Sequence, residues 1–522
     1  MEEKYIAAVD MGSGKIALSV AKISGDDVSI VFYGERPSNG IKNSAVFNPM
    51  KAAAPIREII SEAENELKIK ILQVIVGLPR CDVFQETAKA RADRTDPDEN
   101  ITLEEVENLK AIAQEDYPLS DPGRQVLYGA VAQSFSTDEE IQLVENDIVG
   151  VISSSFEGNF KLFIGRKSAV RSIDKIFNDL GIAIARKYFT PAAQAKAVLT
   201  EDEMNGGVAL VDFGAGATSV TIYQGNILRH YAAIPFGGNA ITGDITNECG
   251  ISPRLAENIK YAFGACMPEK LQTLGEKTIQ IEGGEEEGFK QIPVKYLSEI
   301  ITARVREILD AILYEIQGSG LADNLRNGMV ITGGGAKLTN LANYIKEVSG
   351  YSVRVGRPRR KVSAEGCKGV FEPSATTLIG MILSAKEDGL AGCVDPAETP
   401  VYEDLEGLDV VRSPYAGSEI SLAETADSAD SESPAETASP AASARPAETA
   451  VSAGTAQQMI PEDATEGTGA NLFPDTEVPK KDPGKGKKDN KGHKVGLKMP
   501  RFIRVTWDRA MKYVDSATDE MS

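Results

Sequence analysis

The sequence contains few of the side chains that most often build metal sites and catalytic triads. Its 522 residues include two histidines, His230 and His493, and five cysteines that form no CxxC pair. Two histidines are too few to make a histidine-based metal site or a serine–histidine–aspartate triad a strong expectation. The scattered cysteines are typical of a reducing cytoplasm and predict neither a disulfide framework nor a zinc site. No apolar run reaches the roughly 18–20 residues of a spanning helix, so we expect no integral membrane segment.

The charge balance argues against nucleic acid as a partner. The chain has a formal net charge of −21 and a sequence pI of about 4.8. An acidic chain is a poor general binder of nucleic acid. The N-terminal segment MEEKYIAAVD is acidic and soon enters an apolar strand, which is not the pattern of a signal peptide.

The composition changes sharply near residue 390. Before it, apolar strands alternate with helical patterns and glycine turns, which predicts an α/β fold. Residues 391–479 are rich in Ala, Glu, Ser, Thr and Pro, and we expect a disordered acidic linker there. Its repeated phrase Pro-Ala-Glu-Thr is either a docking motif or drift in a low-complexity tract. Residues 480–500 have the opposite net charge to this acidic tract, since they contain eight lysines and only two aspartates.

Two turns between apolar strands share a pattern that suits phosphate binding. The first is Asp10-x-Gly12-x-Gly14 followed by Lys15, and the second is Asp212-x-Gly214-x-Gly216. Glycines let backbone N–H groups approach phosphate oxygens, and an aspartate at a strand end can hold Mg²⁺ through water. One copy alone is more simply a hairpin turn. Two copies indicate a duplicated domain that grips a nucleotide from both sides.

A third glycine-rich segment completes the pattern. The apolar strand Met329–Thr332 runs into Gly333, Gly334 and Gly335, after which we expect a helix. Bare glycines let the backbone approach adenine or ribose, and a helix N-terminus favours an anion. Taken alone, an ordinary strand–helix turn explains this segment. The order of the three segments favours a nucleotide site.

These loops resemble those of the actin–Hsp70–sugar-kinase superfamily, and residues 1–390 resemble most specifically the FtsA family of bacterial cell-division proteins. The same holds for the segments Ile234–Ile245, Ala256–Cys266 and Glu372–Leu383. The block ITLEEVENLKAIA followed by RQVLYGAVAQSF is similar to a subdomain peculiar to FtsA, and Thr102 with Glu105 predicts a capping box there.

The resemblance implies an α/β, actin-like duplicated ATPase-domain fold with an FtsA-type inserted subdomain, a disordered tail and a C-terminal amphipathic helix. The expected parts are a first actin-like subdomain (1–82 with 166–200 and 360–390), the inserted subdomain (83–165), a second core subdomain (201–225 and 305–359), a second small subdomain (226–304), the acidic linker (391–479), the basic segment (480–500) and the helix (501–517).

The resemblance also implies ATP and Mg²⁺ as cofactors. Asp10 and Asp212 would hold the metal through water, and Glu257 and Lys260, three residues apart on one helix face, would meet the ribose and adenine. The full set of expected nucleotide-binding residues is Asp10, Gly12, Ser13, Gly14, Lys15, Asp212, Gly214, Ala215, Gly216, Ala217, Thr218, Gly238, Glu257, Lys260, Gly333, Gly334 and Gly335.

One position departs from the superfamily pattern and bears on catalysis. The superfamily has Glu or Gln before the proline of the linking helix, whereas Thr190 precedes Pro191 here. A threonine hydroxyl is a poor base, and Gln194 one turn later is the substitute. We therefore expect at most a slow ATPase. Thr190 argues against a sugar or acetate kinase, and a disordered region after 390 argues against a chaperone with a β-rich substrate domain.

The C-terminal segment predicts a membrane anchor. Ile503, Trp507, Met511 and Val514 recur at helical spacing and form one apolar stripe, with basic residues off it. An unattached basic amphipathic helix with Trp and Phe binds an anionic membrane surface. The alternative is a helix packed on the core. The expected membrane residues are Phe502, Ile503, Arg504, Trp507, Met511 and Lys512.

Together these features predict a protein that forms filaments at the cytoplasmic face of the inner membrane, at the division septum. The FtsA resemblance implies that it binds the C-terminal tail of the tubulin-like protein FtsZ, anchors the FtsZ ring and recruits later divisome membrane proteins. In that family the tail docks on the subdomain matching 226–304. Asn239 and Arg304 lie in matching segments, although Arg304 is equally explained as a solvated helix charge.

Overall fold

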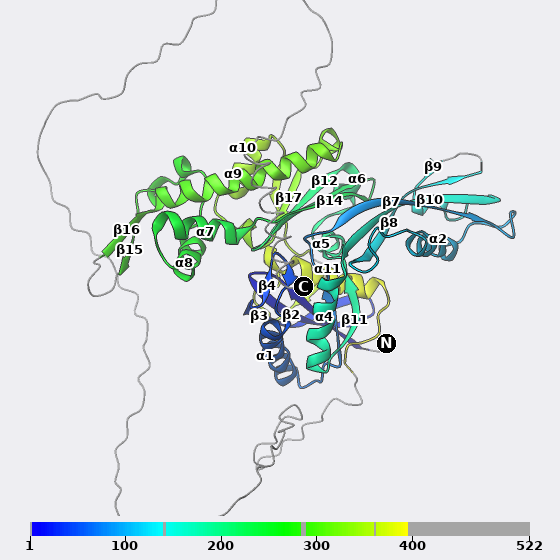
Figure 1. Cartoon of the computed structure of the whole chain (residues 1–522), viewed down its shortest axis with the longest axis horizontal. Helices are drawn as coiled ribbons and strands as arrows, with labels where there is room; N and C mark the ends of the chain where they lie inside the picture. Colours follow the sequence, from blue (N-terminus) through cyan, green and yellow to red (C-terminus); the bar gives the residue numbers. More distant parts are fainter. Residues whose placement is uncertain (1–2, 139–141, 283–288, 360–361, 395–522) are drawn as a thin grey trace, which may run out of the picture. The chain divides into compact units, whose positions relative to one another are not determined.

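The computed structural model describes residues 3–138, 142–282, 289–359 and 362–394, all of which belong to one unit of the fold (Figure 1). The predicted linker (391–479) therefore lies outside the described residues beyond 394. The basic segment (480–500) and the amphipathic helix (501–517) lie wholly outside them.

The first sheet is built around an antiparallel meander to which further strands add in parallel. Its strand order is β11-β6-β1-β2-β3-β19. β6 pairs parallel to β1, β11 parallel to β6, and β19 parallel to β3. The bounds are β1 Lys4–Met11, β2 Lys15–Ser24, β3 Asp27–Pro37, β6 Gln73–Gly77, β11 Ala183–Tyr188 and β19 Val362–Ala364, with a small hairpin β4 Ile41–Lys42 and β5 Ala45–Val46. α1 (Pro49–Leu67) and α4 (Lys167–Leu180) contact each other and this sheet.

The second sheet repeats the topology of the first. Its order is β14-β13-β12-β17-β18, with an antiparallel meander β12-β13-β14 and parallel neighbours β17 and β18. The bounds are β12 Val208–Phe213, β13 Thr218–Gln224, β14 Ile227–Ile234, β17 Met329–Thr332 and β18 Val353–Val355. The duplication predicted from the two Asp-x-Gly-x-Gly turns is therefore visible in the strand order, because each turn joins the first two strands of its meander.

Two helices that follow the sheets pack closely against each other. They are α5 (Thr190–Val198) and α11 (Thr376–Glu387). A Cβ atom on Gly380 would overlap the carbonyl of Ala193, so glycine is required for this approach. α11 is buried from Thr376 to Ala385, as expected for a helix that is apolar on all sides. α11 also contacts β1, β2 and β6, which places its first turn near the ends of the central strands.

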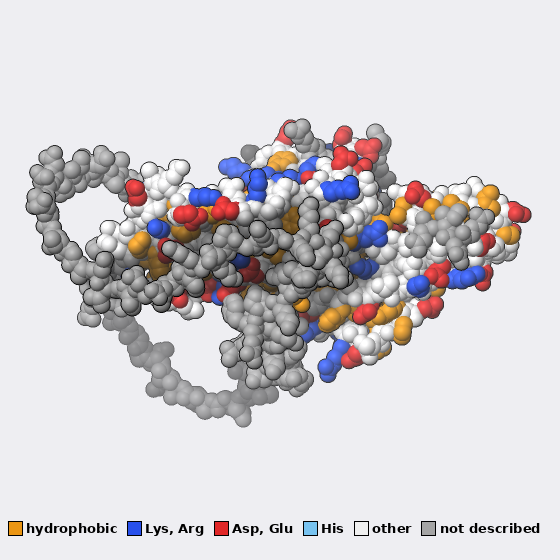
Figure 2. Space-filling view, turned by 90° about the horizontal axis from the view of Figure 1, so that it is seen from above, with side chains coloured by type: hydrophobic (Ala, Val, Ile, Leu, Met, Phe, Trp, Pro, Cys, Tyr) orange, Lys and Arg blue, Asp and Glu red, His pale blue; other side chains and the backbone are white. Residues whose placement is uncertain are grey.

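Residues 84–166 form a separate antiparallel sheet of order β7-β10-β8-β9, covered by α2. The capping box predicted at the start of α2 is confirmed, because the Glu105 N–H donates to Thr102 Oγ1 (3.2 Å) and the Thr102 N–H donates to Glu105 Oε2 (2.8 Å). Hydrophobic side chains show on this part of the surface in Figure 2, among charges of both signs. The bounds are β7 Phe84–Asp93, α2 Leu103–Glu115, β8 Gln125–Thr137, β9 Gln142–Leu143, α3 Glu145–Ile148 and β10 Ser155–Arg166.

The remaining helices, except for the first of them, share one hydrophobic core with the second sheet. They are α6 Glu201–Gly206, α7 Gly238–Cys249, α8 Pro253–Phe263, α9 Val294–Gly318 and α10 Leu341–Ser349, with the hairpin β15 Thr278–Glu282 and β16 Phe289–Pro293. Short 3₁₀ turns are η1 Pro268–Lys270, η2 Gln272–Leu274, η3 Ala322–Asn324, η4 Gly334–Lys337 and η5 Pro373–Ala375. None of the described helices is both long and apolar enough to cross a membrane. The five cysteines, all in the described part of the chain, are free thiols.

Candidate nucleotide site

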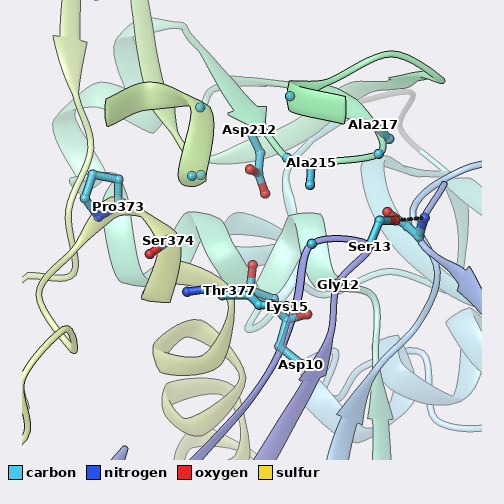
Figure 3. Close-up of a pocket in the computed structure, with 18 of the residues that line it drawn as sticks. Asp10, Gly12, Ser13, Lys15, Asp212, Ala215, Ala217, Pro373, Ser374 and Thr377 are labelled. Atoms are coloured by element: carbon cyan, nitrogen blue, oxygen red, sulfur yellow. Dashed lines mark hydrogen bonds between the residues drawn. The ribbon is translucent and has the colours of Figure 1, made fainter. Parts of the chain in front are cut away.

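A cavity of about 560 Å³ lies where the turns after β1 and β12 meet β17, α5 and α11 (Figure 3). Nearly all the residues predicted to bind nucleotide line it, and so do Thr190 and Gln194. The lining members of the predicted set are Asp10, Gly12, Ser13, Gly14, Lys15, Asp212, Gly214, Ala215, Gly216, Ala217, Gly238, Glu257, Lys260, Gly333, Gly334 and Gly335.

The two phosphate-type loops contact each other at one side of this cavity. A Cβ atom on Gly14 would lie 2.7 Å from the Cβ of Ala215, and one on Gly216 would lie 2.5 Å from Ser13 Oγ. The Ser13 hydroxyl in turn accepts a hydrogen bond from the Ser44 N–H (2.8 Å). Glycine is therefore required at both contact points for steric reasons. The small side chain of Ala215, one of the predicted nucleotide-binding residues, fits against Gly14.

The third glycine segment follows its predicted order of strand, glycines and helix. The strand Met329–Thr332 is confirmed, and Gly333 has a left-handed φ of 83° beside the Phe213 carbonyl, where a Cβ would lie 2.6 Å away. The glycines enter the 3₁₀ turn η4, and the expected helix, α10, begins at Leu341 after Asn340 at φ 63°. The N–H groups closest to the glycines therefore belong to η4 and not to the first turn of α10.

Glu257 and Lys260 lie on one face of α8, as their spacing predicted. Lys260 Nζ is 2.7 Å from Glu257 Oε2 and also donates to the Gly238 carbonyl (2.9 Å) and to Thr242 Oγ1 (2.8 Å). The Thr242 hydroxyl donates to the same Glu257 carboxylate. Thr242 on α7 therefore fixes both predicted side chains. Sequence reasoning missed it because the contact joins two helices and depends on their packing.

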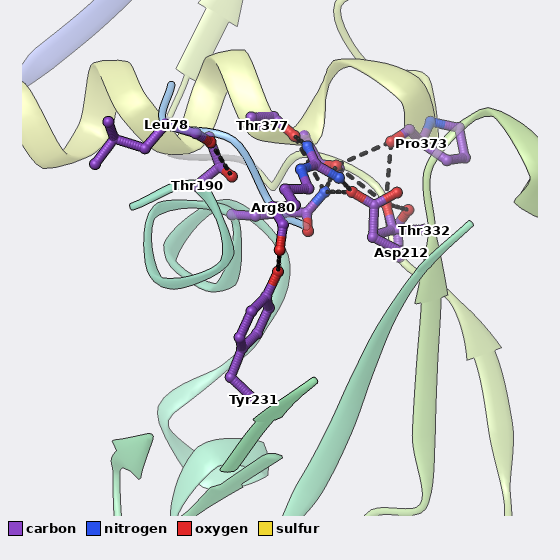
Figure 4. Close-up of polar contacts among 11 residues, drawn as sticks. Leu78, Arg80, Thr190, Asp212, Tyr231, Thr332, Pro373 and Thr377 are labelled. Atoms are coloured by element: carbon purple, nitrogen blue, oxygen red, sulfur yellow. Dashed lines mark hydrogen bonds and ion pairs between the residues drawn. The ribbon is translucent and has the colours of Figure 1, made fainter. Parts of the chain in front are cut away.

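Asp212 is the centre of a buried polar network (Figure 4). Its Oδ2 atom pairs with Arg80 Nη1 and accepts a hydrogen bond from Gln194 Nε2 (2.8 Å). Arg80 Nη2 donates to Thr377 Oγ1 (2.6 Å), and Gln194 Nε2 also donates to Thr376 Oγ1 (2.9 Å). Side chains from the end of β12, from α5, from α11 and from the loop after β6 therefore meet at one carboxylate.

Arg80 was missed in the sequence, where it lies in GLPRCDV without a recognisable motif. A usable signal was its position three residues after β6, a strand that pairs in parallel with β1. Carboxyl ends of neighbouring parallel strands meet at one edge of a sheet, where ligands commonly bind. A charged residue at that edge therefore qualifies as a site residue once the strand order is known.

Lys15, predicted to add positive charge, already has an acidic partner. Its Nζ pairs with the Glu35 carboxylate, which also accepts from the Tyr33 hydroxyl. Burial alone would raise the pKa of Glu35. The hydrogen bonds from Lys15 and Tyr33 lower it by more than burial raises it, so the net shift of the pKa is downward. Glu35 therefore offsets part of the charge that the first loop presents to the cavity.

Thr190 and Gln194 line the cavity, and each donates hydrogen bonds to protein groups. The Thr190 hydroxyl donates to the Leu78 carbonyl at 3.4 Å, and the Gln194 amide nitrogen donates into the Asp212 network. Both side chains are buried. Their catalytic role stays a prediction.

Thr218 is the predicted nucleotide-binding residue that does not line the cavity: it is fully buried, and its hydroxyl donates to the Phe236 carbonyl (2.9 Å). Asn239 and Arg304 were predicted to contact a partner, and that role stays a prediction. Asn239 donates its backbone N–H to the Ala215 carbonyl (2.7 Å). Arg304 forms two hydrogen bonds with Asp244 and one with Glu307, and the hydrogen bond to Asp244 raises the pKa of Arg304. The Arg304 side chain is 25% exposed on α9, so the alternative of a helix surface charge stays open.

The two aspartates predicted to hold a magnesium ion differ in their surroundings. Asp10 and Asp212 both line the cavity, where a metal can be held through water. Asp212 Oδ2 is already bonded to Arg80 and Gln194, so a guanidinium charge offsets this carboxylate before any metal binds. Among the described residues, no three Asp, Glu, His or Cys side chains cluster as a metal-binding group.

The duplicated sheets, the paired helices and the shared cavity define an actin-like α/β fold. A solved structure titled PilM-PilN type IV pilus biogenesis complex confirms this fold, with a TM-score of 0.52 and 16% identity over 73% of this chain and 98% of that chain.

The sequence comparisons are more specific. The family model described as Cell division protein FtsA matches residues 209–380. Cell division protein FtsA of Neisseria meningitidis serogroup B is 27% identical over 408 residues, which cover 78% of this chain and 95% of the relative. Cell division protein FtsA of Bacillus subtilis (strain 168) is 26% identical over 382 residues, which cover 73% of this chain and 83% of the relative. These matches confirm the resemblance to the FtsA family inferred from the sequence.

Proposed function

We propose that this chain is an actin-like cell-division protein that binds ATP in the cavity and assembles with itself at the membrane. The observation that carries the nucleotide part is the convergence of three glycine-rich segments from both sheets on one cavity. The relatives' shared name, Cell division protein FtsA, supports the cell-division part. The fold alone would not distinguish a cell-division protein from a kinase or a chaperone of the same superfamily.

In this proposal the two contacting loops hold the phosphates through backbone N–H groups. Glu257 and Lys260 meet the ribose and adenine, and Gly333, Gly334 and Gly335 lie against the nucleoside. Mg²⁺ held near Asp10 through water would supply positive charge against the phosphates. Because the loops come from different sheets, a bound nucleotide would contact both halves of the fold at once.

The side chains at Thr190 and Gln194 support slow hydrolysis. A general base must accept a proton from the attacking water, and a threonine hydroxyl and a glutamine amide are both poor bases. The Thr190 hydroxyl is directed at a backbone carbonyl, and the Gln194 nitrogen is held by Asp212 and Thr376. We expect ATP to act mainly as a conformational ligand. A turnover of several per second by the purified protein would contradict this.

Nucleotide binding is tested by titrating the full chain with a fluorescent ATP analogue. Lys260→Gln should weaken binding about tenfold, because it removes a hydrogen-bonded charge. The matched control is Lys175→Gln on α4, where the lysine is exposed and pairs only with Asp179 one turn away. No binding by the unaltered protein would overturn the proposal.

Exposed apolar side chains on the inserted sheet support self-association. Leu103 and Ile152 are 58% and 61% exposed, on neighbouring backbone segments joined by the Asn100–Ile152 bridge. Exposed apolar groups gathered in one region are typical of interaction sites. Ile152→Glu should reduce ATP-dependent pelleting at least severalfold. Met50→Glu, which changes an 81% exposed side chain on α1, is the control and should pellet normally.

Membrane attachment and FtsZ binding rest on the sequence, since residues 501–517 lie outside the described part. We propose that this segment ties filaments to the cytoplasmic face of the inner membrane at the septum. The subdomain at 226–304 would bind the FtsZ tail, and the filaments would recruit later divisome proteins to the septum. Trp507→Glu should release the protein, and FtsZ with it, from anionic vesicles. Unchanged sedimentation of both would contradict the tether.

A further inference from the structure

We propose that Arg80 is a built-in counter-ion of Asp212 that replaces a metal ion's charge at the second phosphate loop and faces the phosphates of the nucleotide. This inference rests on the proposed nucleotide binding. It starts from the contact described above, in which a guanidinium already offsets the charge of the Asp212 carboxylate.

The Asp212 carboxylate is more buried than the acidic members of the other two ion pairs that line the cavity. The Asp212 and Arg80 side chains are 3% and 15% exposed, whereas Glu35 and Glu257 are 41% and 49% exposed. One guanidinium nitrogen pairs with Asp212 Oδ2 and the other terminal nitrogen donates to Thr377 Oγ1 (2.6 Å). A guanidinium carries five N–H donors, so these contacts leave donors for a further anion. Arg80 also lines the cavity, and we expect the remaining donors to reach a phosphate bound there.

The backbone of Arg80 is held as firmly as its side chain. Its carbonyl accepts a hydrogen bond from the Tyr231 hydroxyl at 2.6 Å (Figure 4). The Tyr231 ring packs edge-on against Phe189 and Phe163, with centroids 5.1 and 6.3 Å apart. Its backbone N–H donates to Gln85 Oε1 (2.8 Å). Arg80 is therefore fixed at both ends before any ligand arrives, which lowers the ordering cost of binding an anion.

The charge argument follows from the same contacts. A buried carboxylate beside a triphosphate repels it strongly, because little solvent screens the two like charges. In many phosphate sites a divalent cation cancels that repulsion. Here Arg80 cancels it at Asp212 and adds a fork-shaped donor suited to phosphate oxygens. Nucleotide binding should therefore depend less on Mg²⁺ in the unaltered protein than in a variant without Arg80, although an ion near Asp10 still contributes charge.

The test is isothermal titration of the full chain with ATP, in Mg²⁺ and in EDTA. For the unaltered protein we expect dissociation constants within about threefold of each other. Arg80→Gln should bind at least about tenfold more weakly in EDTA than in Mg²⁺, because Asp212 is then unpaired. Arg80→Lys, which keeps the charge, should stay within about threefold. Equal metal dependence in the unaltered protein and Arg80→Gln would overturn the inference.

Two further variants keep the test decisive if Arg80→Gln does not fold. Asp212→Asn frees the arginine charge for the phosphates, so binding in EDTA should tighten by about threefold or more. Arg80→Gln combined with Asp212→Asn removes both charges and should lose the metal dependence. Unaltered binding in the first or strong metal dependence in the second would contradict the role of Arg80. Absence of ATP binding in every form would instead refute the proposed function.

Discussion

The two phosphate-type loops share a sequence pattern but stand in different electrostatic surroundings. In the first, Lys15 pairs with Glu35 near the surface, with side chains 27% and 41% exposed. In the second, Asp212 pairs with Arg80 in the interior. Both partners come from outside the motifs, Glu35 from β3 and Arg80 from the loop after β6. The two halves thus share the strand–turn–strand backbone of the loop. The charged partner of each loop comes from a neighbouring segment and differs between the halves.

This difference in burial should separate the loops energetically. A surface ion pair contributes about 0–1 kcal/mol to stability, whereas removing one member of a buried pair leaves an uncompensated charge. The second loop therefore combines a binding site with a structural ion pair, and the first is free of that constraint. Three changes test this contrast, from the largest expected effect to the smallest.

The largest effect should come from removing the buried carboxylate. Asp212→Ala leaves Arg80 buried without its partner, so the free energy of unfolding should fall by about 3 kcal/mol or more. Asp10→Ala changes the equivalent, partly exposed residue of the first loop, and the loss should stay below about 1 kcal/mol. Urea unfolding followed by circular dichroism measures both values.

A double variant separates charge from packing in that result. Asp212→Asn with Arg80→Gln leaves no buried charge and retains side chains of similar size, so most of the loss should be recovered. Equal losses for Asp212→Ala and Asp10→Ala would show that burial does not distinguish the loops. Failure of the double variant to recover stability would assign the loss to packing.

The second change tests the contact between the loops. Gly14→Ala would place a Cβ 2.7 Å from the Ala215 Cβ, and neither backbone can yield without moving its loop. We expect nucleotide affinity to fall about tenfold, or about 1.4 kcal/mol. Adding Ala215→Gly opens the space and should restore affinity to within about twofold. Titration of the single and double variants measures this, and an absent rescue would mean that the loops do not touch in solution.

The sequence predicted the parts of this site that depend on local pattern. The strands around both turns, the glycines and the shared face of Glu257 and Lys260 follow from apolar runs, turn residues and helical spacing. The capping box at Thr102 and Glu105 is equally local. Each of these features needs only a short window of the chain, which is why periodicity and residue type suffice to predict it.

The missed features depend on how distant segments pack. Glu35 reaches Lys15 because β2 and β3 pair in one register, and Arg80 reaches Asp212 across the two sheets. Neither contact has a signature within its own segment. The path between the glycines and the predicted helix was also missed, because the 3₁₀ turn η4 and the left-handed backbone at Asn340 precede the start of α10. The ion pairs Lys15–Glu35 and Arg80–Asp212 can therefore be predicted only when the tertiary structure is known.

The smallest expected effect concerns the exposed pair of the first loop and its pH dependence. The folded-state pKa of Glu35 is lowered, so its pairing stabilises the fold above the unfolded-state pKa of about 4.3 and is lost as pH falls through the folded value. Lys15→Met should therefore lower the free energy of unfolding by less than about 1 kcal/mol near pH 7. The difference from the unaltered protein should shrink toward zero as the pH falls below the lowered folded-state pKa of Glu35.

Urea unfolding of both proteins at several pH values measures this difference, with Lys15→Arg as the variant that keeps the charge. Lys15→Arg should follow the unaltered protein at every pH, because it retains the partner of Glu35. A Lys15→Met loss that is independent of pH would trace to packing of the lysine stem and not to the ion pair. A loss as large as that of Asp212→Ala would remove the contrast between the loops, since burial could then no longer explain why the second loop alone depends on its cation.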